Sequence, residues 1–322
     1  MLSRRALLVA AGGSALPALP ALAADSFPGF VASLRAEARR AGISELTLDR
    51  ALAGLRPNTK VLELDRHQPE FTLTWDRYRA TRLSEQRIAN GRDAFRQSRP
   101  TLLAISNRFG VDPGVIVGIW GLESNYGGYT GGFGVVEALA TLAWEGRRAS
   151  FFRTELISAF RILDHGDVTP QRMTGSYAGA MGQPQFMPSS YQRFAVDFDG
   201  DGRRDIWDSR ADVLASIANY LSRSGWRAGE PWGQPVRVPP SLDVARTGRE
   251  NRRSLGEWMR MGVTRADGRP FSRGDVPAAL VLPDGAGGEA FATYGNFNVI
   301  RRYNPSDYYA LSVGLLGDSV VA

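Results

Sequence analysis

The chain has 322 residues, of which 43% are hydrophobic, and it can therefore bury a substantial core in two or three domains. Cysteine is absent, which excludes disulfides, thiolate metal sites and a lipid anchor on cysteine, and the only lysine, Lys60, follows no phosphate-binding loop sequence. The net charge of +6 comes almost wholly from arginines that are scattered along the chain.

Residues 1–23 are typical of a cleaved export signal. Arg4 and Arg5 form a basic start that resembles a twin-arginine signal, residues 6–22 are apolar, and the sequence ALA at residues 21–23 offers a cleavage site. A poorly ordered tail or a retained membrane anchor is the alternative, but the apolar run is short and contains two prolines. We therefore expect a monomer that is soluble in the periplasm after cleavage and does not bind nucleic acid.

The rest of the chain predicts a mainly α protein with a smaller β part (α+β). Residues 24–100 are expected to form a helical N-terminal region, because apolar residues recur three and four apart up to Pro100. Residues 101–226 are also mostly helical in pattern. Residues 227–292 are rich in proline and glycine, and their β-prone runs, QPVRVP and AALVLP, predict a small β-rich inserted domain. Residues 293–322 return to a helical pattern after Pro305.

The segment VDPGVIVGIWGLESNYGG, residues 111–128, predicts a buried helix that ends in a carboxylate. Asp112 suits the N-cap, Pro113 suits the first helical position, residues 115–122 are apolar on every face, and two glycines at 127–128 are expected to stop the helix. Glu123 then lies in the last turn, at the negative end of the helix dipole. Apolar surroundings and the dipole both raise the pKa of Glu123 toward neutral pH. A structural ion pair and a catalytic role are equally supported by these residues alone.

The segment DFDGDGRRDIWD, residues 197–208, has the spacing of an EF-hand calcium loop. Carboxylates occupy positions 1, 3, 5, 9 and 12, and glycine occupies position 6. Five acids within twelve residues repel one another unless a cation lies among them. The predicted ligands of a structural Ca²⁺ are Asp197, Asp199, Asp201, the carbonyl of Arg203, and Asp208, which is shorter than the usual glutamate. The alternative is a surface turn whose acids are neutralised by arginines.

Several longer segments resemble the lytic murein transglycosylase B family. They are VGIWGLESNYG, EALATLAWEGRRASFF, SYAGAMGQPQFMPSSYQRFAVDFDGDGRRDIWD, ANYLSRSGW and YNPSDYYALSV, and they occur in this order. The resemblance implies a lysozyme-like helical core formed by residues 101–226 and 293–322, a helical N-terminal region, a small β-domain and an EF-hand-like calcium loop, with no organic cofactor. Two features depart from relatives: GQPQ replaces a loop of small residues, and no cysteine is present to carry a lipid.

The resemblance also implies an activity. It is cleavage of the β-1,4 bond between N-acetylmuramic acid and N-acetylglucosamine in peptidoglycan glycan strands, with formation of 1,6-anhydromuramoyl products. Glu123 is then the single catalytic acid and base. The residues that match sugar-binding positions of the family are Arg147, Arg148, Ser176, Gln185, Tyr220, Tyr303, Asn304 and Tyr309. Other cell-wall enzymes are further candidate partners. The alternatives are a hydrolytic muramidase and a catalytically silent, calcium-dependent cell-wall-binding protein.

Overall fold

The computed structural model describes residues 26–66 and 73–322, and the expected export signal lies outside these ranges. The first seven helices of the described residues are α1 (Phe27–Arg40), α2 (Glu45–Leu52), α3 (Thr59–Arg66), α4 (Trp75–Arg82), α5 (Glu85–Phe109), α6 (Pro113–Ser124) and α7 (Val135–Glu145). The others are α8 (Ala149–His165), α9 (Pro188–Phe194), α10 (Arg210–Arg223), α11 (Leu255–Arg260), α12 (Gly295–Tyr303) and α13 (Asp307–Val321). The strands are β1 (Phe133–Gly134), β2 (Thr174–Gly175), β3 (Gly233–Arg237), β4 (Arg253–Ser254), β5 (Thr264–Arg265), β6 (Pro277–Val281) and β7 (Ala290–Thr293).

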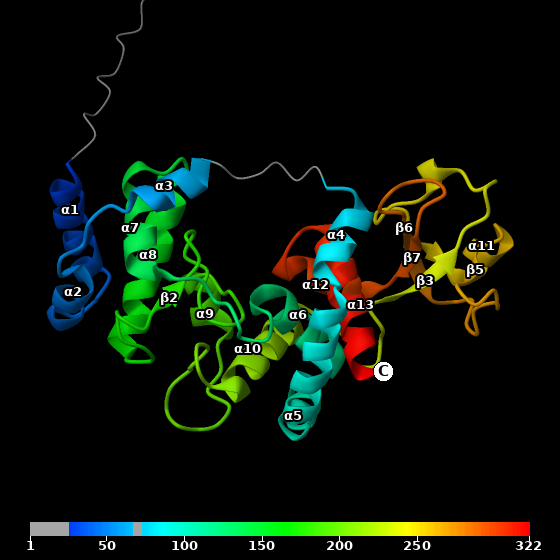
Figure 1. Ribbon diagram of the computed structural model, residues 1–322, viewed down its shortest axis with the longest axis horizontal. Coiled ribbons are helices and arrows are strands. Elements are labelled where there is room, and N and C mark those ends of the chain that lie inside the picture. Colours follow the sequence, from blue (N-terminus) through cyan, green and yellow to red (C-terminus); the bar gives the residue numbers. More distant parts are fainter. Residues whose placement is uncertain (1–25, 67–72) are drawn as a thin grey trace, which may run out of the picture.

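The helices gather in two groups, and the larger sheet lies beyond them (Figure 1). α1, α2 and α3 lie at one end with α7 and α8, where α2 packs on α8 and α3 packs on α7. α4 and α5 instead pack on α13 near the middle of the molecule. The N-terminal region is therefore helical, as predicted, but its helices are divided between two neighbourhoods.

The boundary expected after residue 100 falls inside a helix, because α5 continues through Pro100 to Phe109. Proline cannot donate the helical hydrogen bond, and its ring crowds the preceding turn, at a cost of about 3 kcal/mol. The helix nevertheless has buried residues on both sides of the proline, including Ala94, Ser98, Leu102 and Ile105. Tertiary packing along this face offsets the local cost.

The α6 helix passes through the centre of the molecule, as its uniformly apolar sequence predicted. It is buried at every position from Gly114 to Gly121. It crosses α13 at close range, because a Cβ at Gly118 would collide with the carbonyl oxygen of Val313. Within the described residues no single helix is long and apolar enough to cross a membrane; α5 and α6 reach that length and hydropathy only together, with a bend of 113° between them.

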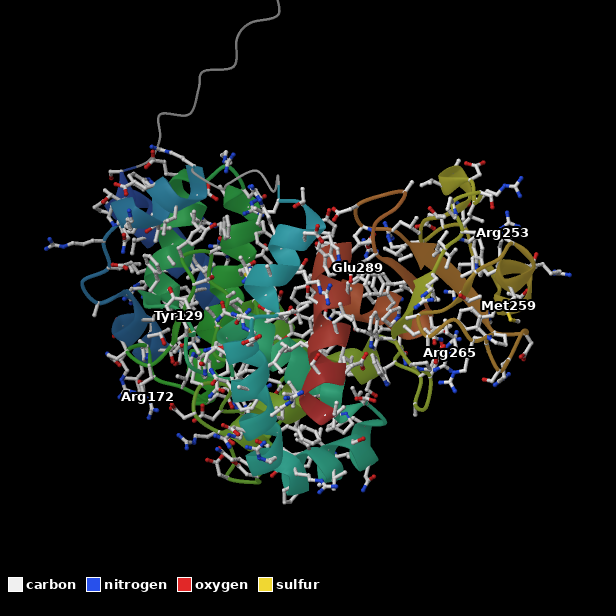
Figure 2. All side chains as sticks on the ribbon, turned by 45° about the vertical axis from the view of Figure 1, so that its right-hand side comes forward. Tyr129, Arg172, Arg253, Met259, Arg265 and Glu289 are labelled. Atoms are coloured by element: carbon white, nitrogen blue, oxygen red, sulfur yellow. The ribbon has the colours of Figure 1, made fainter. Side chains whose placement is uncertain are left out.

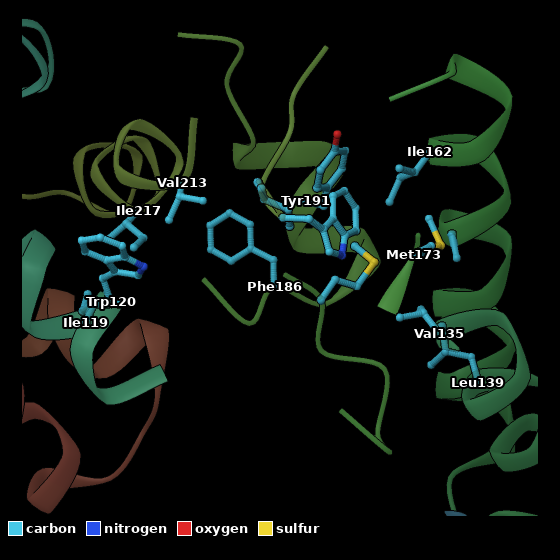
Figure 3. Close-up of a cluster of buried hydrophobic side chains, with 14 of the residues drawn as sticks. Ile119, Trp120, Val135, Leu139, Ile162, Met173, Phe186, Tyr191, Val213 and Ile217 are labelled. Atoms are coloured by element: carbon cyan, nitrogen blue, oxygen red, sulfur yellow. The ribbon is translucent and has the colours of Figure 1, made fainter. Parts of the chain in front are cut away.

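A continuous hydrophobic core connects α6 to the distant α7–α8 pair. Figure 3 shows Trp120 of α6 beside Ile217 of α10, followed by Phe186 and by Tyr191 of α9, with α7 and α8 beyond them. These four side chains are almost fully buried. The core therefore fixes the C-terminal part of α6 relative to the loops that precede α9.

The β-rich character of residues 227–292 is confirmed by a five-stranded antiparallel sheet of order β4-β6-β7-β3-β5. The two runs that predicted strands form β3 and β6. The sheet and α11 share a hydrophobic core of their own, built around Trp258, Phe271 and Leu280. A second, two-stranded ribbon pairs β1 with β2 and holds the loop that follows α6.

Candidate active site

The C-terminal end of α6 presents Glu123 in the last helical turn, as predicted. The helix begins at Pro113, after the N-cap residue Asp112, whose side chain accepts a hydrogen bond of 2.7 Å from the backbone nitrogen of Gly114. It ends at Ser124, earlier than the glycine pair at 127–128 that was expected to stop it. The reason is that Asn125 and Tyr126 both adopt positive φ angles, of 50° and 60°, which end the helix. Few residues other than glycine adopt such angles without strain.

Tyr126 holds this strained turn in place. Its ring packs edge-on against Trp120 at 5.6 Å between centroids, and its hydroxyl donates a hydrogen bond of 3.0 Å to the carbonyl of Arg87 in α5. The ring lies against Gly91 of α5 and Gly121 of α6, where any Cβ would collide with it. The turn that directly follows Glu123 is therefore held by contacts with both α5 and α6.

Glu123 is a carboxyl whose proton exchanges near neutral pH. Burial raises its pKa from 4.5 to about 7, although a hydrogen bond from Tyr309 and the positive charge of Arg82 both act in the opposite direction. The Tyr309 hydroxyl donates to Oε1 of Glu123 at 2.6 Å. Part of the Glu123 side chain still reaches solvent. A group with this pKa can act both as an acid and as a base.

Phenol groups surround this carboxyl. Burial raises the pKa values of Tyr303 and Tyr309 well above 10, and the charge of Glu123 adds to the effect, so both hydroxyls stay protonated. Tyr303 donates to the carbonyl of Pro184 at 2.6 Å, and its ring lies 4.6 Å from that of Tyr220. The structure thus brings together three of the predicted sugar-binding tyrosines.

Ser176 and Gln185 shape a loop next to the end of α6. Ser176 Oγ accepts a hydrogen bond of 3.0 Å from the backbone nitrogen of Ala180. Gln185 has a φ of 51°, and its amide donates to the carbonyls of Thr130 and Gly182 at 3.0 and 2.8 Å. Both predicted residues therefore make local contacts that set the course of the loops on either side of this site.

The remaining predicted binding residues have other surroundings. Asn304 lies between α12 and α13, where its side chain accepts a hydrogen bond of 3.1 Å from the backbone nitrogen of Ser306. Arg147 and Arg148 lie at the α7–α8 corner and face Asp65 of α3, at 3.5 and 3.9 Å. The contacts of the two arginines connect them to α3, and they share none with Glu123 among the described residues.

Two residues of α4, Tyr78 and Arg82, interact electrostatically with Glu123 and were not predicted from the sequence. The charge of Arg82 lowers the pKa of Glu123, and the charge of Glu123 contributes to the raised pKa of Tyr78, whose main cause is burial. The two side chains are four residues apart and so share a helix face. That spacing was visible in the sequence, but nothing local indicated that α4 packs near the end of α6.

A group of three carboxylates that could hold a metal ion lies at the loop that resembles an EF-hand, and one of its members was not predicted. Carboxylate oxygens of Asp197, Asp199 and Asp212 lie within 4.8 Å of one another. Asp212 belongs to α10 and is fully buried, and it accepts hydrogen bonds of 2.7 and 2.8 Å from the backbone nitrogens of Phe198 and Asp205. Burial raises the pKa of Asp212, although the hydrogen bonds from the backbone of Phe198 and Asp205 act in the opposite direction. An all-oxygen donor set of this kind fits Ca²⁺.

Two of the expected ligands are engaged elsewhere. Asp208 forms an ion pair with Arg172, which lies on the surface in Figure 2. The Asp201 side chain pairs with Arg203 at 2.9 Å. These ion pairs agree with the alternative of a surface turn whose acids are neutralised by arginines, and the predicted ligand set stays a prediction. The acid that joins Asp197 and Asp199 in the group is Asp212 of α10, whereas Asp208 faces Arg172.

Known proteins share both the sequence and the fold of this chain. The transglycosylase SLT domain family matches residues 26–318. The membrane-bound lytic murein transglycosylase B of Escherichia coli K12 is 34% identical over 252 residues, which cover 76% of this chain and 67% of that protein.

Solved structures of two proteins add detail to this similarity. SltB3 of Pseudomonas aeruginosa, determined with NAG-anhNAM-pentapeptide and with NAG-NAM-pentapeptide, superposes with a TM-score of 0.90 at 46% identity and covers 92% of this chain and 80% of its own. The lytic transglycosylase Slt35 of Escherichia coli, determined with calcium, gives a TM-score of 0.76 at 32% identity over 92% of both chains. This chain belongs to the transglycosylase SLT domain family of lytic murein transglycosylases.

Proposed function

We propose that the protein is a lytic transglycosylase that cleaves the β-1,4 bond between N-acetylmuramic acid and N-acetylglucosamine in peptidoglycan and leaves a 1,6-anhydromuramoyl end. The observation that carries this proposal is one carboxyl, Glu123, with a pKa of about 7 and a phenol hydrogen bond. Within the described residues, the side chains that act on the pKa of Glu123 are Tyr309 and Arg82, and neither is a carboxylate. Ordinary glycosidases need a pair of carboxyls.

A single carboxyl suffices if it acts twice. In the first step, protonated Glu123 donates its proton to the glycosidic oxygen, the bond from C1 to that oxygen breaks, and N-acetylglucosamine leaves as an alcohol. The positive charge at C1 is stabilised by the carbonyl of the substrate's own N-acetyl group. In the second step, ionised Glu123 removes the proton from the C6 hydroxyl, whose oxygen bonds to C1. Water is not consumed, and Glu123 ends in its starting form.

The phenols around Glu123 support both steps. The Tyr309 hydroxyl stays protonated and donates to Glu123, so it stabilises the ionised form that exists between the steps. We assign the sugar-binding positions to the residues that the family pattern matches: Arg147, Arg148, Ser176, Gln185, Tyr220, Tyr303, Asn304 and Tyr309. Of these, Tyr303 interacts electrostatically with Glu123, whose charge contributes to its raised pKa.

We also propose a structural Ca²⁺ in the 197–212 region. Asp197, Asp199 and Asp212 would hold it, and it would bind the loop to α10 without taking part in the chemistry. The expected export signal supports action on the wall outside the cytoplasmic membrane, with the protein soluble after cleavage.

Product analysis tests the proposed function. Purified protein is incubated with peptidoglycan sacculi, and the released muropeptides are weighed by mass spectrometry. We expect anhydro products, which weigh one water less than hydrolytic products, and no release by the Glu123→Gln variant. Products that have gained one water by hydrolysis would identify a muramidase. A wild type that binds sacculi but releases no products would identify a cell-wall-binding protein.

A further inference from the structure

The side-chain amide of Gln183 joins α6 to a distant segment of the chain. Its Oε1 accepts a hydrogen bond of 2.8 Å from the indole nitrogen of Trp120, and its Nε2 donates one of 2.7 Å to the carbonyl of Trp207. The backbone nitrogen of Gln183 also donates to the carbonyl of Ile206 at 2.9 Å. Because an indole can only donate and a carbonyl can only accept, a single side chain with both functions is needed to connect them.

This connection reaches the turn that directly follows Glu123. Trp120 lies one helical turn before Glu123, and its ring is buried in the core shown in Figure 3, edge-on to the ring of Tyr126. Gln183 also lies against the turn itself, because a Cβ at Gly127 would be 2.5 Å from its Oε1. A movement of the amide would therefore be passed to both sides of the turn.

The segment to which the amide is tied is itself held firmly. The indole of Trp207 donates a hydrogen bond of 3.0 Å to the carbonyl of Thr174, which belongs to β2. The backbone nitrogen of Asp205 donates to the buried carboxylate of Asp212 in α10 at 2.8 Å. Residues 206–207 thus offer a fixed point against which α6 can be positioned.

The next two residues of the chain hold the opposite side of the site. The carbonyl of Pro184 accepts the hydrogen bond from Tyr303, and the amide of Gln185 donates to the carbonyl of Thr130. They belong to the segment GQPQ, which departs from relatives. This one segment therefore contacts the helix before Glu123, the loop after it and a tyrosine from α12.

We propose that Gln183 is a positioning residue, which holds the turn after Glu123 in its active arrangement by tying Trp120 to the carbonyl of Trp207. This inference rests on the proposed function. Without the amide, a buried indole nitrogen and a main-chain carbonyl lose their partner, which costs more free energy than one hydrogen bond contributes. The end of α6 and residues 206–207 would then move relative to each other. A displacement of about 1 Å at a reacting group can lower a rate about a hundredfold.

The test is Gln183→Met, which keeps the length of the side chain and removes both polar groups. Release of anhydro products from soluble glycan strands is measured well below the melting temperature of each variant. We expect kcat to fall about tenfold or more and KM to stay within about twofold of the wild type. The alkaline limb of the pH profile of kcat/KM should also move upward by about half to one pH unit. The displaced turn weakens the hydrogen bond from Tyr309 that favours ionised Glu123.

The matched control is Gln234→Met in β3, which removes a half-buried amide that donates to the hydroxyl of Tyr294 in the sheet. It should leave kcat, KM and the alkaline limb unchanged. Gln183→Asn, whose amide is withdrawn by about 1.5 Å, should move the limb in the same direction and tests the inference if the methionine variant does not fold.

Three results would overturn the inference. They are an unchanged kcat for Gln183→Met, equal losses for Gln183→Met and Gln234→Met, and a lower kcat with the alkaline limb in its original place. The last result would mean that only the amount of folded protein had changed. Failure of the proposed function is a different result, because the wild type itself would then release no anhydro products.

Discussion

Replacing Glu123 with glutamine should stabilise the protein at alkaline pH and leave its stability unchanged at acidic pH. The carboxyl has a pKa of about 7 in the folded protein and 4.5 as its ordinary value. Below pH 4.5 the carboxyl is protonated in both the folded and the unfolded chain, so it does not lower the free energy of unfolding. Between pH 4.5 and about pH 7 the carboxyl is ionised in the unfolded chain but still protonated in the folded one, and the free energy of unfolding falls. Above about pH 7 the loss is complete.

The size of this loss follows from the two pKa values. Each pH unit between 4.5 and about 7 contributes about 1.4 kcal/mol, which gives about 3 kcal/mol in total. Glutamine has the shape of the protonated carboxyl and can still accept the hydrogen bond from Tyr309. The variant should therefore match the wild type at pH 4 and exceed its free energy of unfolding by about 3 kcal/mol at pH 8.

Urea denaturation followed by tryptophan fluorescence at a series of pH values measures this difference. The control is Glu250→Gln, because the Glu250 side chain is 91% exposed and its replacement should leave the curve parallel to that of the wild type. Parallel curves for Glu123→Gln and the wild type from pH 4 to pH 8 would refute the claim that burial raises the pKa of Glu123.

Three further changes have expected outcomes. Tyr309→Phe removes the hydrogen bond that favours the ionised carboxyl, so the alkaline limb of the pH profile of kcat/KM should move from about 7 upward by about one to two pH units; a downward shift would contradict this. Calcium at about a thousand times its dissociation constant should stabilise the protein by about 4 kcal/mol against a chelator, and Asp212→Asn should abolish this gain in thermal melts while Asp208→Asn keeps it. Gly118→Ala should destabilise the protein by about 2 kcal/mol or more in urea, because its Cβ meets the backbone of α13, whereas Gly132→Ala, with open space around it, should have little effect.

The sequence predicted those parts of the site whose causes are local. An apolar run between a proline and a pair of glycines was enough to place Glu123 at the end of a buried helix, and the direction of its pKa followed from the same run. The precise end of that helix was not predictable. It depends on Tyr126, whose strained backbone is held by contacts with α5.

Parts of the site that depend on distant residues could not be read from the sequence alone. Tyr309 lies 186 residues after the carboxyl to which it donates, and only the family resemblance singled it out. Asp212 lies outside the twelve-residue loop pattern, so a search that stops at position 12 selects Asp208 instead. The twelve-residue spacing describes the loop, whereas the buried acid is supplied by the following helix.

The inserted sheet has a part in the site that composition alone did not suggest. Its β6–β7 connection carries Asp284 and Glu289, which bind the start of α4, and a carbonyl in the same connection accepts a hydrogen bond of 3.2 Å from the hydroxyl of Tyr308. Both helices that act on Glu123 from the side of the sheet, α4 and α13, are therefore held by one connection. Residues 282–289 therefore help to hold the two helices that carry Tyr78 and Tyr309. Changes in that connection should alter the position of Tyr78 and Arg82 before they alter the buried core around α6.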